Sequence, residues 1–381
     1  MPAFILLFGF PLSRTPRGKG VVTLKNHERR PCHLILEDGA LFSGHSFGAE
    51  SEANGEVVFN TGMVGYPESF SDPSYRGQIL CLTYPLIGNY GVPERSERNF
   101  EHYFESERVH ISGLVVSEYS EFHHHWQANS GLSDWLREQN VPGIAGIDTR
   151  ALTKHLREKG SMRGCIRADL SPALSFKEEQ GQQHSVSEVS VEKPITYEGG
   201  RKRVVLVDCG CKQTIIKSLL NRGLTVIRVP WNEDVLKHEP DGVLFSNGPG
   251  DPLWVSETIE NAKKVMAANI PTFGICLGNQ IMALAAGAKT YKLKFGHRSQ
   301  NQPCRIVGEK RCFITSQNHG YAVDTASLPA DWSPWFENAN DGTNEGIRHK
   351  TKSYMSVQFH PEAKPGPVDT GYLFDEFVEM I

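Results

Sequence analysis

The stretch "PTFGICLGNQIMALAAG", Pro271 to Gly287, predicts a strand that turns sharply into a helix. Its apolar start is typical of a buried strand, and "NQIMALAAG" has the spacing of a helix that ends at a glycine. Cys276 stands at the turn, inside the pentapeptide "GICLG". This is the G-x-nucleophile-x-G arrangement with a cysteine as the nucleophile, where small flanking residues leave room for a tight turn.

The helix that follows Cys276 favours chemistry at this thiol. Free N–H groups and the positive end of the helix dipole favour a thiolate there, and the N–H of Leu277 is placed to stabilise an oxyanion. A buried, inert cysteine in an ordinary strand–helix turn is the alternative interpretation. The pentapeptide alone does not decide between the two.

Strands and helices alternate on both sides of this turn. "VVLVD", "LTVIRVP" and "GVLF" read as strands, while "KQTIIKSLLNRG" and "ETIENAKKVMAAN" read as helices. This alternation predicts an α/β domain over residues 204–381, with a mostly parallel, doubly wound sheet covered on both faces. Functional sites of such sheets lie at the carboxyl ends of the strands.

Two further segments of this domain strengthen the case for catalysis. The predicted strand Met355 to Phe359 leads into His360-Pro361-Glu362. Residues i and i+2 of an extended backbone point to the same side, so His360 can take the proton of Cys276 while Glu362 orients the imidazole. The loop "SNGPGDP", residues 246–252, follows another strand, and its glycines let backbone N–H groups approach a ligand closely.

The part of the chain before residue 204 has a different pattern. Residues 32–170 contain short β-rich stretches separated by turn residues, which predicts a strand-rich α+β N-terminal domain. "DTRALTKHLREKG" predicts one clear helix, with Asp148 or Thr149 as N-cap and Gly160 just past its end. Residues 171–203 are polar and predict a linker region with one short strand at "SEVSV".

Composition excludes several classes of protein. The 381 residues carry 40 Lys+Arg against 44 Asp+Glu, so nothing suggests a nucleic-acid binder, and no apolar run approaches a membrane span. The eight cysteines lack a regular spacing, which favours reduced thiols in an intracellular compartment. The run His123-His124-His125 has no evident carboxylate or cysteine partner, so no metal site is expected.

The first 31 residues form a distinct segment. They carry six Lys or Arg and a single acid, Glu28. A transit peptide has this bias, and a plain extension without an address has it equally well, so both interpretations stay open. The compartment is therefore mitochondrial or cytoplasmic, with the basic segment favouring the mitochondrion.

At "FSNGPGDP", "FGICLGNQ" and "QFHPE" the chain resembles the class I (triad) glutamine amidotransferases, whose three signatures appear in this order. "LEDGALFSG", "GEVVFNTGMVGYPESFSDPSYRGQILCLTYPLIGNYG", "GIDTRALTKHLREKG" and "TSQNHGYAV" resemble the glutaminase subunit or domain of carbamoyl-phosphate synthetase. Other class I amidotransferases, such as those for GMP or anthranilate, lack this leading domain. The resemblance covers residues 33–381.

The resemblance implies an activity and a set of site residues. Cys276, His360 and Glu362 would form the triad that hydrolyses glutamine through a γ-glutamyl thioester. By the same resemblance, the oxyanion and glutamine would be held by Ser74, Gly248, Gly250, Leu277, Gln280, Asn318, Gly320 and Tyr321. The ammonia would pass to a synthetase large subunit or fused synthetase domain, where ATP and Mg are expected; no cofactor is expected in this chain.

Two positions depart from the family's pattern. Asn279 stands where histidine is usual, and Ser299 stands where glycine is common. Asn279 puts the rate or the coupling in doubt, and a side chain at 299 could disturb a tight loop. The alternatives are therefore a catalytically weak scaffold or regulatory subunit of the synthetase, and a stand-alone thiol hydrolase of γ-glutamyl compounds. Whether the product feeds arginine, pyrimidine or urea synthesis is not readable from these motifs.

Overall fold

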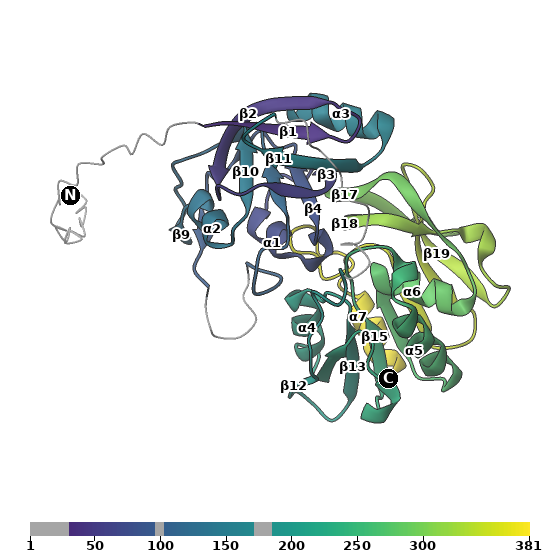
Figure 1. The fold of residues 1–381 in the computed structure, drawn as a ribbon. Helices are drawn as coiled ribbons and strands as arrows, with labels where there is room; N and C mark the ends of the chain where they lie inside the picture. Colours follow the sequence, from purple (N-terminus) through teal and green to yellow (C-terminus); the bar gives the residue numbers. More distant parts are fainter. Residues whose placement is uncertain (1–29, 96–102, 171–184) are drawn as a thin grey trace, which may run out of the picture.

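The computed structural model describes residues 30–95, 103–170 and 185–381. Two large sheets organise them: a closed barrel from the first half of the chain and a ten-stranded sheet from the second (Figure 1). Most of the basic N-terminal segment discussed above, residues 1–29, lies outside the described residues.

The N-terminal half closes into a barrel in the order β1-β11-β3-β4-β7-β10-β2. Side chains such as Leu34, Val57 and Ile79 fill it and are fully buried. The strand-rich prediction is confirmed, but barrel closure was not predicted, because it depends on pairings between strands far apart in sequence, such as β1 with β11. The barrel strands are β1 (Pro31–Leu36), β2 (Leu41–Gly48), β3 (Ala53–Asn60), β4 (Gln78–Leu82), β7 (Gly113–Val115), β10 (Pro142–Ala145) and β11 (Met162–Arg167).

The helix predicted from "DTRALTKHLREKG" is α3 (Thr149–Lys159). Asp148 is its N-cap and accepts the Ala151 N–H, and Gly160 follows the last turn at φ 107. Its apolar side covers the barrel. The remaining elements of this half are α1 (Tyr66–Ser71), η1 (Pro73–Tyr75), α2 (Leu132–Glu138) and the short strand pairs β5 (Leu86–Ile87) with β8 (Glu118–Tyr119), and β6 (Val92–Pro93) with β9 (Ala128–Ser130).

The second half builds a mixed sheet in the order β12-β14-β13-β15-β16-β21-β20-β19-β17-β18. Its core, β14-β13-β15-β16-β21, is parallel, as predicted. The outer strands run antiparallel, an extension that the sequence pattern did not predict. The strands are β12 (Ile195–Tyr197), β13 (Arg203–Asp208), β14 (Thr225–Pro230), β15 (Gly242–Phe245), β16 (Thr272–Ile275), β17 (Thr290–Ile306), β18 (Cys312–Val323), β19 (Trp332–Asn338), β20 (Asn344–His349) and β21 (Tyr354–Val357).

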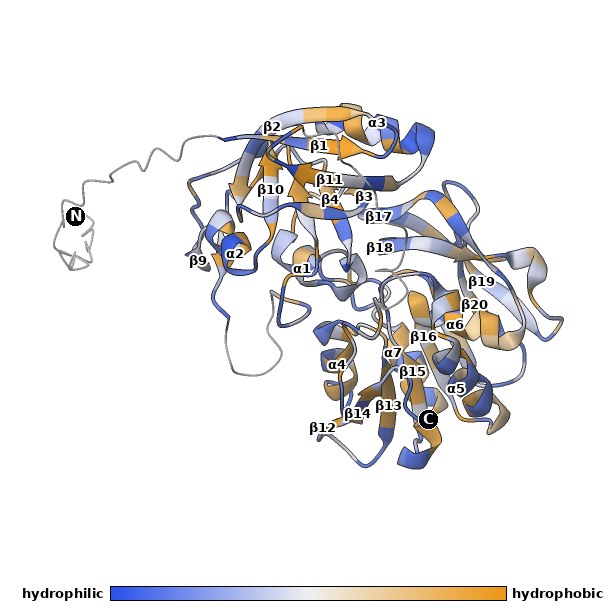
Figure 2. Cartoon of the chain, in the orientation of Figure 1, coloured by the Kyte–Doolittle hydropathy of each residue, from blue (hydrophilic) through white to orange (hydrophobic). Residues whose placement is uncertain are grey.

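Helices cover both faces of the parallel core. Val204 and Leu206 of β13 face α4 (Gln213–Leu220) and α7 (Leu373–Met380), whereas Val205 and Val207 face α5 (Ser256–Ala267) and α6 (Leu277–Ala286). Because successive side chains of a strand point to opposite faces, a strand buried on both sides reads as a continuous apolar run. The central strands are accordingly coloured apolar in Figure 2.

The prediction of a short strand at "SEVSV" is wrong. Residues 185–189 form turns, with the N–H groups of Val189 and Ser190 both donating to the Val186 carbonyl. Val186 is buried against the sheet, so an apolar anchor at one point, rather than strand pairing, fixes this segment. The nearby strand is β12, which begins at Ile195.

No helix among the described residues has the length and apolar character needed to cross a bilayer. All eight cysteines lie within the described residues as free thiols, and every one but Cys312 is buried.

Candidate active site

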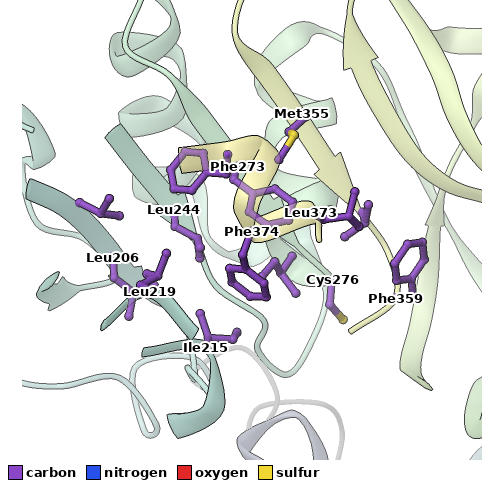
Figure 3. Close-up of a cluster of buried hydrophobic side chains, with 14 of the residues drawn as sticks. Leu206, Ile215, Leu219, Leu244, Phe273, Cys276, Met355, Phe359, Leu373 and Phe374 are labelled. Atoms are coloured by element: carbon purple, nitrogen blue, oxygen red, sulfur yellow. The ribbon is translucent and has the colours of Figure 1, made fainter. Parts of the chain in front are cut away.

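Cys276 lies on a strained turn between β16 and α6. Its backbone has φ 56 and ψ −103, a conformation that non-glycine residues adopt rarely and mostly at functional sites. The flanking glycines are required by space: a Cβ on Gly278 would lie 2.1 Å from the Phe245 carbonyl oxygen, and one on Gly274 would lie 2.6 Å from the Gly278 oxygen. Figure 3 shows Cys276 at one end of the apolar cluster, near Phe359.

His360 and Glu362 follow β21, the parallel neighbour of β16, so they reach the same edge of the sheet as Cys276. His360 Nδ1 lies 2.7 Å from Glu362 Oε1, and both side chains are buried. Among the described residues, His360 Nε2 has no well-formed hydrogen bond. Cys276 is nevertheless one of the groups that act on the imidazole, which places the thiol near the ring.

The charges around His360 keep its imidazole protonated. Burial alone would lower the pKa of His360, but the charge of Glu362, its hydrogen bond to Nδ1 and the nearby Cys276 thiol outweigh it and raise the pKa to about 10. Burial alone would raise the pKa of Glu362, but the charges of Lys212 and His360 hold it at about 2. Near neutral pH the pair is therefore an imidazolium beside a carboxylate.

Lys212 is a member of this cluster that the sequence reasoning missed. Its Nζ lies 3.0 Å from Glu362 Oε1 and donates to the Ala363 carbonyl oxygen at 2.6 Å, in a position where the side chain is 3% exposed. Lys212 is the N-cap residue of α4, directly after the carboxyl end of β13. That location at the edge of the sheet is the signal that could have found it.

A cavity of about 280 Å³ opens beside Cys276, at the small end of the range for ligand sites. Leu277 lines it from the helix start and Gly248 from the Gly-Pro-Gly loop, where a Cβ would lie 2.1 Å from the Cys209 carbonyl oxygen. Every other residue expected to hold glutamine also lines this cavity: Ser74, Gly250, Gln280, Asn318, Gly320 and Tyr321. The structure thus gathers them around the thiol; their contacts with glutamine stay a prediction.

Ser74 reaches the cavity from the N-terminal half of the chain. Its hydroxyl accepts from Asn247 Nδ2 at 2.9 Å, and its N–H donates to Asp72 Oδ1 at 2.9 Å. Asp72 Oδ2 in turn accepts from Asn318 Nδ2 at 3.1 Å. Asp72 and Asn247 therefore join the two halves at the site. The sequence did not single them out, although they lie in the motifs "DPSY" and "SNGPGDP".

Gln280 and Asn318 are oriented by the protein before any ligand arrives. Gln280 Nε2 donates to the Tyr321 carbonyl at 2.9 Å and to Gln358 Oε1 at 3.1 Å, so its carbonyl oxygen is the polar group left for a ligand. Asn318 Nδ2 donates to Asp72 Oδ2 at 3.1 Å, and the Asn318 backbone carbonyl oxygen lies 3.7 Å from Cys276 Sγ. Both side chains can therefore bind a ligand without changing rotamer.

The two departures from the family pattern lie away from the reacting atoms. Asn279 Nδ2 donates to Gln358 Oε1 at 3.1 Å, and its Oδ1 accepts from the Ser356 hydroxyl at 2.8 Å. This amide is fully buried and hydrogen-bonded beneath the site. Ser299 is buried in the β17–β18 ladder opposite Gln317, at the start of a register shift that ends at Gln302, so a bulged strand stands where a tight loop was expected.

His297, His319 and Glu345 form a buried group whose ligand-type atoms lie within 4.8 Å of one another. Hydrogen bonding accounts for it: His297 bridges Asp341 at 2.9 Å and Glu345 at 3.3 Å. Asn338 Nδ2 also points at Glu345 at 3.4 Å, and an amide donor inside the group opposes a cation. The expectation that the chain holds no metal stays a prediction.

Comparison with known proteins agrees with this geometry. The family model "Carbamoyl-phosphate synthase small chain, CPSase domain" matches residues 34–166, and "Glutamine amidotransferase class-I" matches residues 205–380. The carbamoyl phosphate synthase arginine-specific small chain of Aspergillus fumigatus is 46% identical over 371 residues, which cover 93% of this chain and 81% of that protein. The chain belongs to the carbamoyl-phosphate synthase small chain family.

Longer proteins contain the same small-chain sequence. Multifunctional protein CAD of Squalus acanthias is 51% identical over 352 residues, covering 91% of this chain. Human "Carbamoyl-phosphate synthase [ammonia], mitochondrial" is 47% identical over 366 residues, covering 94% of this chain. The chain spans 16% of the length of the first of these and 24% of the second.

Proposed function

We propose that this chain hydrolyses the side-chain amide of L-glutamine and passes the ammonia to a carbamoyl-phosphate synthetase partner. One observation carries the proposal: Cys276, His360 and Glu362 stand at the carboxyl ends of adjacent parallel strands, beside a cavity lined by the expected glutamine-binding residues. Membership of the small chain family supports the choice of substrate and partner.

The thiolate of Cys276 attacks the amide carbon of glutamine while its former proton resides on His360. Negative charge that develops on the carbonyl oxygen is stabilised by the N–H groups of Gly248 and Leu277. His360 then gives its proton to the amide nitrogen, the C–N bond breaks, and ammonia leaves a γ-glutamyl thioester on Cys276. A water molecule attacks the thioester, gives a proton to His360, and releases glutamate as the C–S bond breaks.

The charges of the site suit this sequence of steps. With the pKa of His360 at about 10, the imidazolium is available as the acid that expels ammonia across the neutral range. Glu362 stabilises that imidazolium and fixes its tautomer through Nδ1. The partner, as a separate chain or as another part of a longer one, would hold ATP and Mg and use the ammonia with bicarbonate.

The scaffold alternative loses its one sequence argument. The Asn279 side chain is packed beneath the site, and its amide bonds to Gln358 and Ser356 rather than to Cys276 or His360. The triad itself is complete. A stand-alone thiol hydrolase would have no use for the barrel domain that the family model matches at residues 34–166.

Glutamate release from glutamine tests the proposal. The purified chain would be assayed alone and with a carbamoyl-phosphate synthetase large subunit, beside Cys276→Ser. We expect slow release alone, strong stimulation by the partner and loss in the variant. Cysteine-independent release, or none even with the partner, would contradict the glutaminase assignment and favour a scaffold.

We propose further that residues 1–31 address the chain to mitochondria. Their six basic residues and single acid support this, as does the printed name of the human relative. Import of the full chain into isolated mitochondria, compared with a chain that begins at residue 32, is the test. The proposal would be contradicted if the full chain, like the shortened one, were not imported.

A further inference from the structure

Glu105 is a buried carboxylate of the N-terminal half that lies outside the expected triad and cavity residues. Its side chain is 1% exposed. Its backbone N–H donates to the Ser71 hydroxyl at 2.8 Å, which fixes it to the end of α1. A carboxylate is costly to bury unless its oxygens are bound, so its partners identify what it does.

The partners of Glu105 are at the start of α4, in the other half of the chain. Oε2 accepts from the Thr214 N–H at 3.1 Å, and Oε1 accepts from the Thr214 hydroxyl at 2.7 Å. The Gln213 N–H donates to the Glu105 carbonyl oxygen at 2.9 Å. The N-cap residue of α4, Lys212, makes no side-chain cap hydrogen bond. Glu105 therefore caps this helix from the other domain.

The helix that Glu105 caps begins with the lysine of the active site. Lys212 Nζ lies 3.0 Å from Glu362 Oε1, the same oxygen that receives His360 Nδ1. Lys212 and Glu105 also interact through their charges, each shifting the other's pKa. One buried ammonium thus acts on two buried carboxylates, one from each domain, and contacts that of Glu362.

Other charged groups act on Glu105, Lys212 and Glu362 and contribute to the net charge around them. Glu68 acts on Glu105, and Asp72 acts on Lys212, both with negative charge. On the far side His360 acts on His319, a neutral histidine whose pKa lies well below its usual value because it is buried. Within this set, only Lys212 carries positive charge toward both carboxylates.

We propose that Glu105 is a positioning residue for the catalytic pair: it caps α4 from the N-terminal domain, fixes the helix start that places Lys212 against Glu362, and adds a negative charge to the cluster beside His360. This inference rests on the proposed function for its biological meaning. The charge relationship itself can be tested without glutamine.

The direction of the effect follows from the signs of the charges. Lys212 lowers the pKa of His360 and Glu362 raises it. With Glu105 neutralised, the ammonium of Lys212 keeps Glu362 and Asp72 as its negative partners, and the net charge near His360 becomes more positive. The imidazolium is then less stable, so His360 should lose its proton at lower pH.

Glu105→Gln is the informative variant because it keeps the shape and removes the charge. Burial raises the pKa of Glu105 to about 7, so its neutral form is already accessible near neutral pH and the variant should fold. Thr214→Val is the matched control, since it removes the hydroxyl contact but leaves both charges in place. Glu105→Asp is the second variant, with its carboxylate drawn back from Thr214 and Lys212.

The measurement is the rate at which iodoacetate alkylates Cys276 in the full chain, followed on its peptide against pH. Cys312→Ser serves as the background because Cys312 is the exposed thiol. Iodoacetate is an anion, so it reacts fastest while the His360 imidazolium lies beside the thiolate, and the rate falls as His360 loses its proton.

We expect Glu105→Gln to move this falling limb to lower pH by roughly half a unit to one unit, Glu105→Asp to move it less in the same direction, and Thr214→Val to leave it in place. An unmoved limb in both Glu105 variants would overturn the proposal, as would an equal shift in Thr214→Val. Expected shifts without glutamine hydrolysis would support the charge relationship while removing the proposed function.

Discussion

Lys212 and His360 share a single oxygen atom, Oε1 of Glu362. The ammonium lies 3.0 Å from it and the imidazole Nδ1 lies 2.7 Å from it. Glu362 therefore contacts two cationic groups that follow different strands, β13 and β21. A change in the charge of one group consequently alters the electrostatic environment of the other. Several expected properties of the site follow from this arrangement.

Glu362→Gln should move the basic limb of glutamine hydrolysis to lower pH. Glu362 is the charge that does most to raise the pKa of His360, so without it burial should bring that pKa down from about 10. We expect kcat/KM near neutral pH to fall roughly 10²–10⁴-fold, as when a triad carboxylate is lost. The profile of kcat/KM against pH measures both effects.

The matched control for that experiment is Glu309→Gln, which changes an exposed glutamate paired only with Arg311. It should leave the profile unchanged. A basic limb that stays in place in Glu362→Gln would show that Glu362 does not act on His360.

Lys212→Met should destabilise the fold in a pH-dependent manner. It leaves Glu362 and Glu105 buried without their ammonium, and breaking a buried pair costs about 3–5 kcal/mol. Without the ammonium, the folded-state pKa of Glu362 should rise above its unfolded value, and that of Glu105, already about 7, should rise further. Groups of that kind stabilise the fold at low pH and lose the contribution as pH rises, so the deficit should grow from pH 5 to pH 8.

Denaturant unfolding of the variant at both pH values is the measurement. Lys263→Met, which removes an exposed lysine paired with Glu260, is the control and should change little. A deficit in Lys212→Met that is equal at both pH values would contradict the charge argument.

Gly278→Ala should both destabilise the protein and abolish its glutaminase activity. The added Cβ would lie 2.1 Å from the Phe245 carbonyl oxygen, so α6 must move away from β15 and carry Cys276 with it. We expect a loss of about 1–3 kcal/mol in unfolding free energy. Gly131→Ala, where the nearest atom is the flexible Asp134 side chain at 3.3 Å, is the control for thermal unfolding.

Ser74→Ala should weaken glutamine binding more than it slows the chemistry. Ser74 lines the cavity and its hydroxyl is bonded to Asn247 rather than to Cys276 or His360, as expected of a binding group. Loss of one such hydrogen bond is expected to raise KM roughly tenfold with a much smaller change in kcat. Ser43→Ala, on the outside of the barrel beside His33, is the control. A fall confined to kcat would argue against this role.

The residues that are local in sequence could be predicted, and those that depend on domain packing could not. Cys276 was recognisable from the glycines on either side of it, and His360 and Glu362 from their spacing after a strand. Glu105 carries no local signal, because its role arises only when α4 is brought against the N-terminal domain. Lys212 had a signal that was missed, its position after β13 at the carboxyl edge of the sheet. Ser74 was accessible only through the family resemblance.

The same distinction between local and long-range signals applies to the prediction of the fold. The alternating pattern predicted the parallel core, because the helices α4, α5 and α6 follow the strands β13, β15 and β16. The 17-residue strand β17 was not predicted, since "TYKLKFGHRSQNQPCRI" is half exposed, bulged and paired to β18 and β19 instead. The stretch "SEVSV" was predicted as a strand because its two valines are spaced by two. It belongs to a turn, and the residue that packs in the core is Val186, just before it.

The central claim is that Cys276 carries the γ-glutamyl group during glutamine hydrolysis. The most direct measurement is to mix the enzyme with labelled glutamine, stop the reaction with acid during turnover, and identify labelled peptides by mass spectrometry. The account predicts a γ-glutamyl adduct on the Cys276 peptide that is absent in Cys276→Ser and accumulates more when the partner is present. Glutamate release without any adduct on Cys276, or an adduct on another residue, would contradict it.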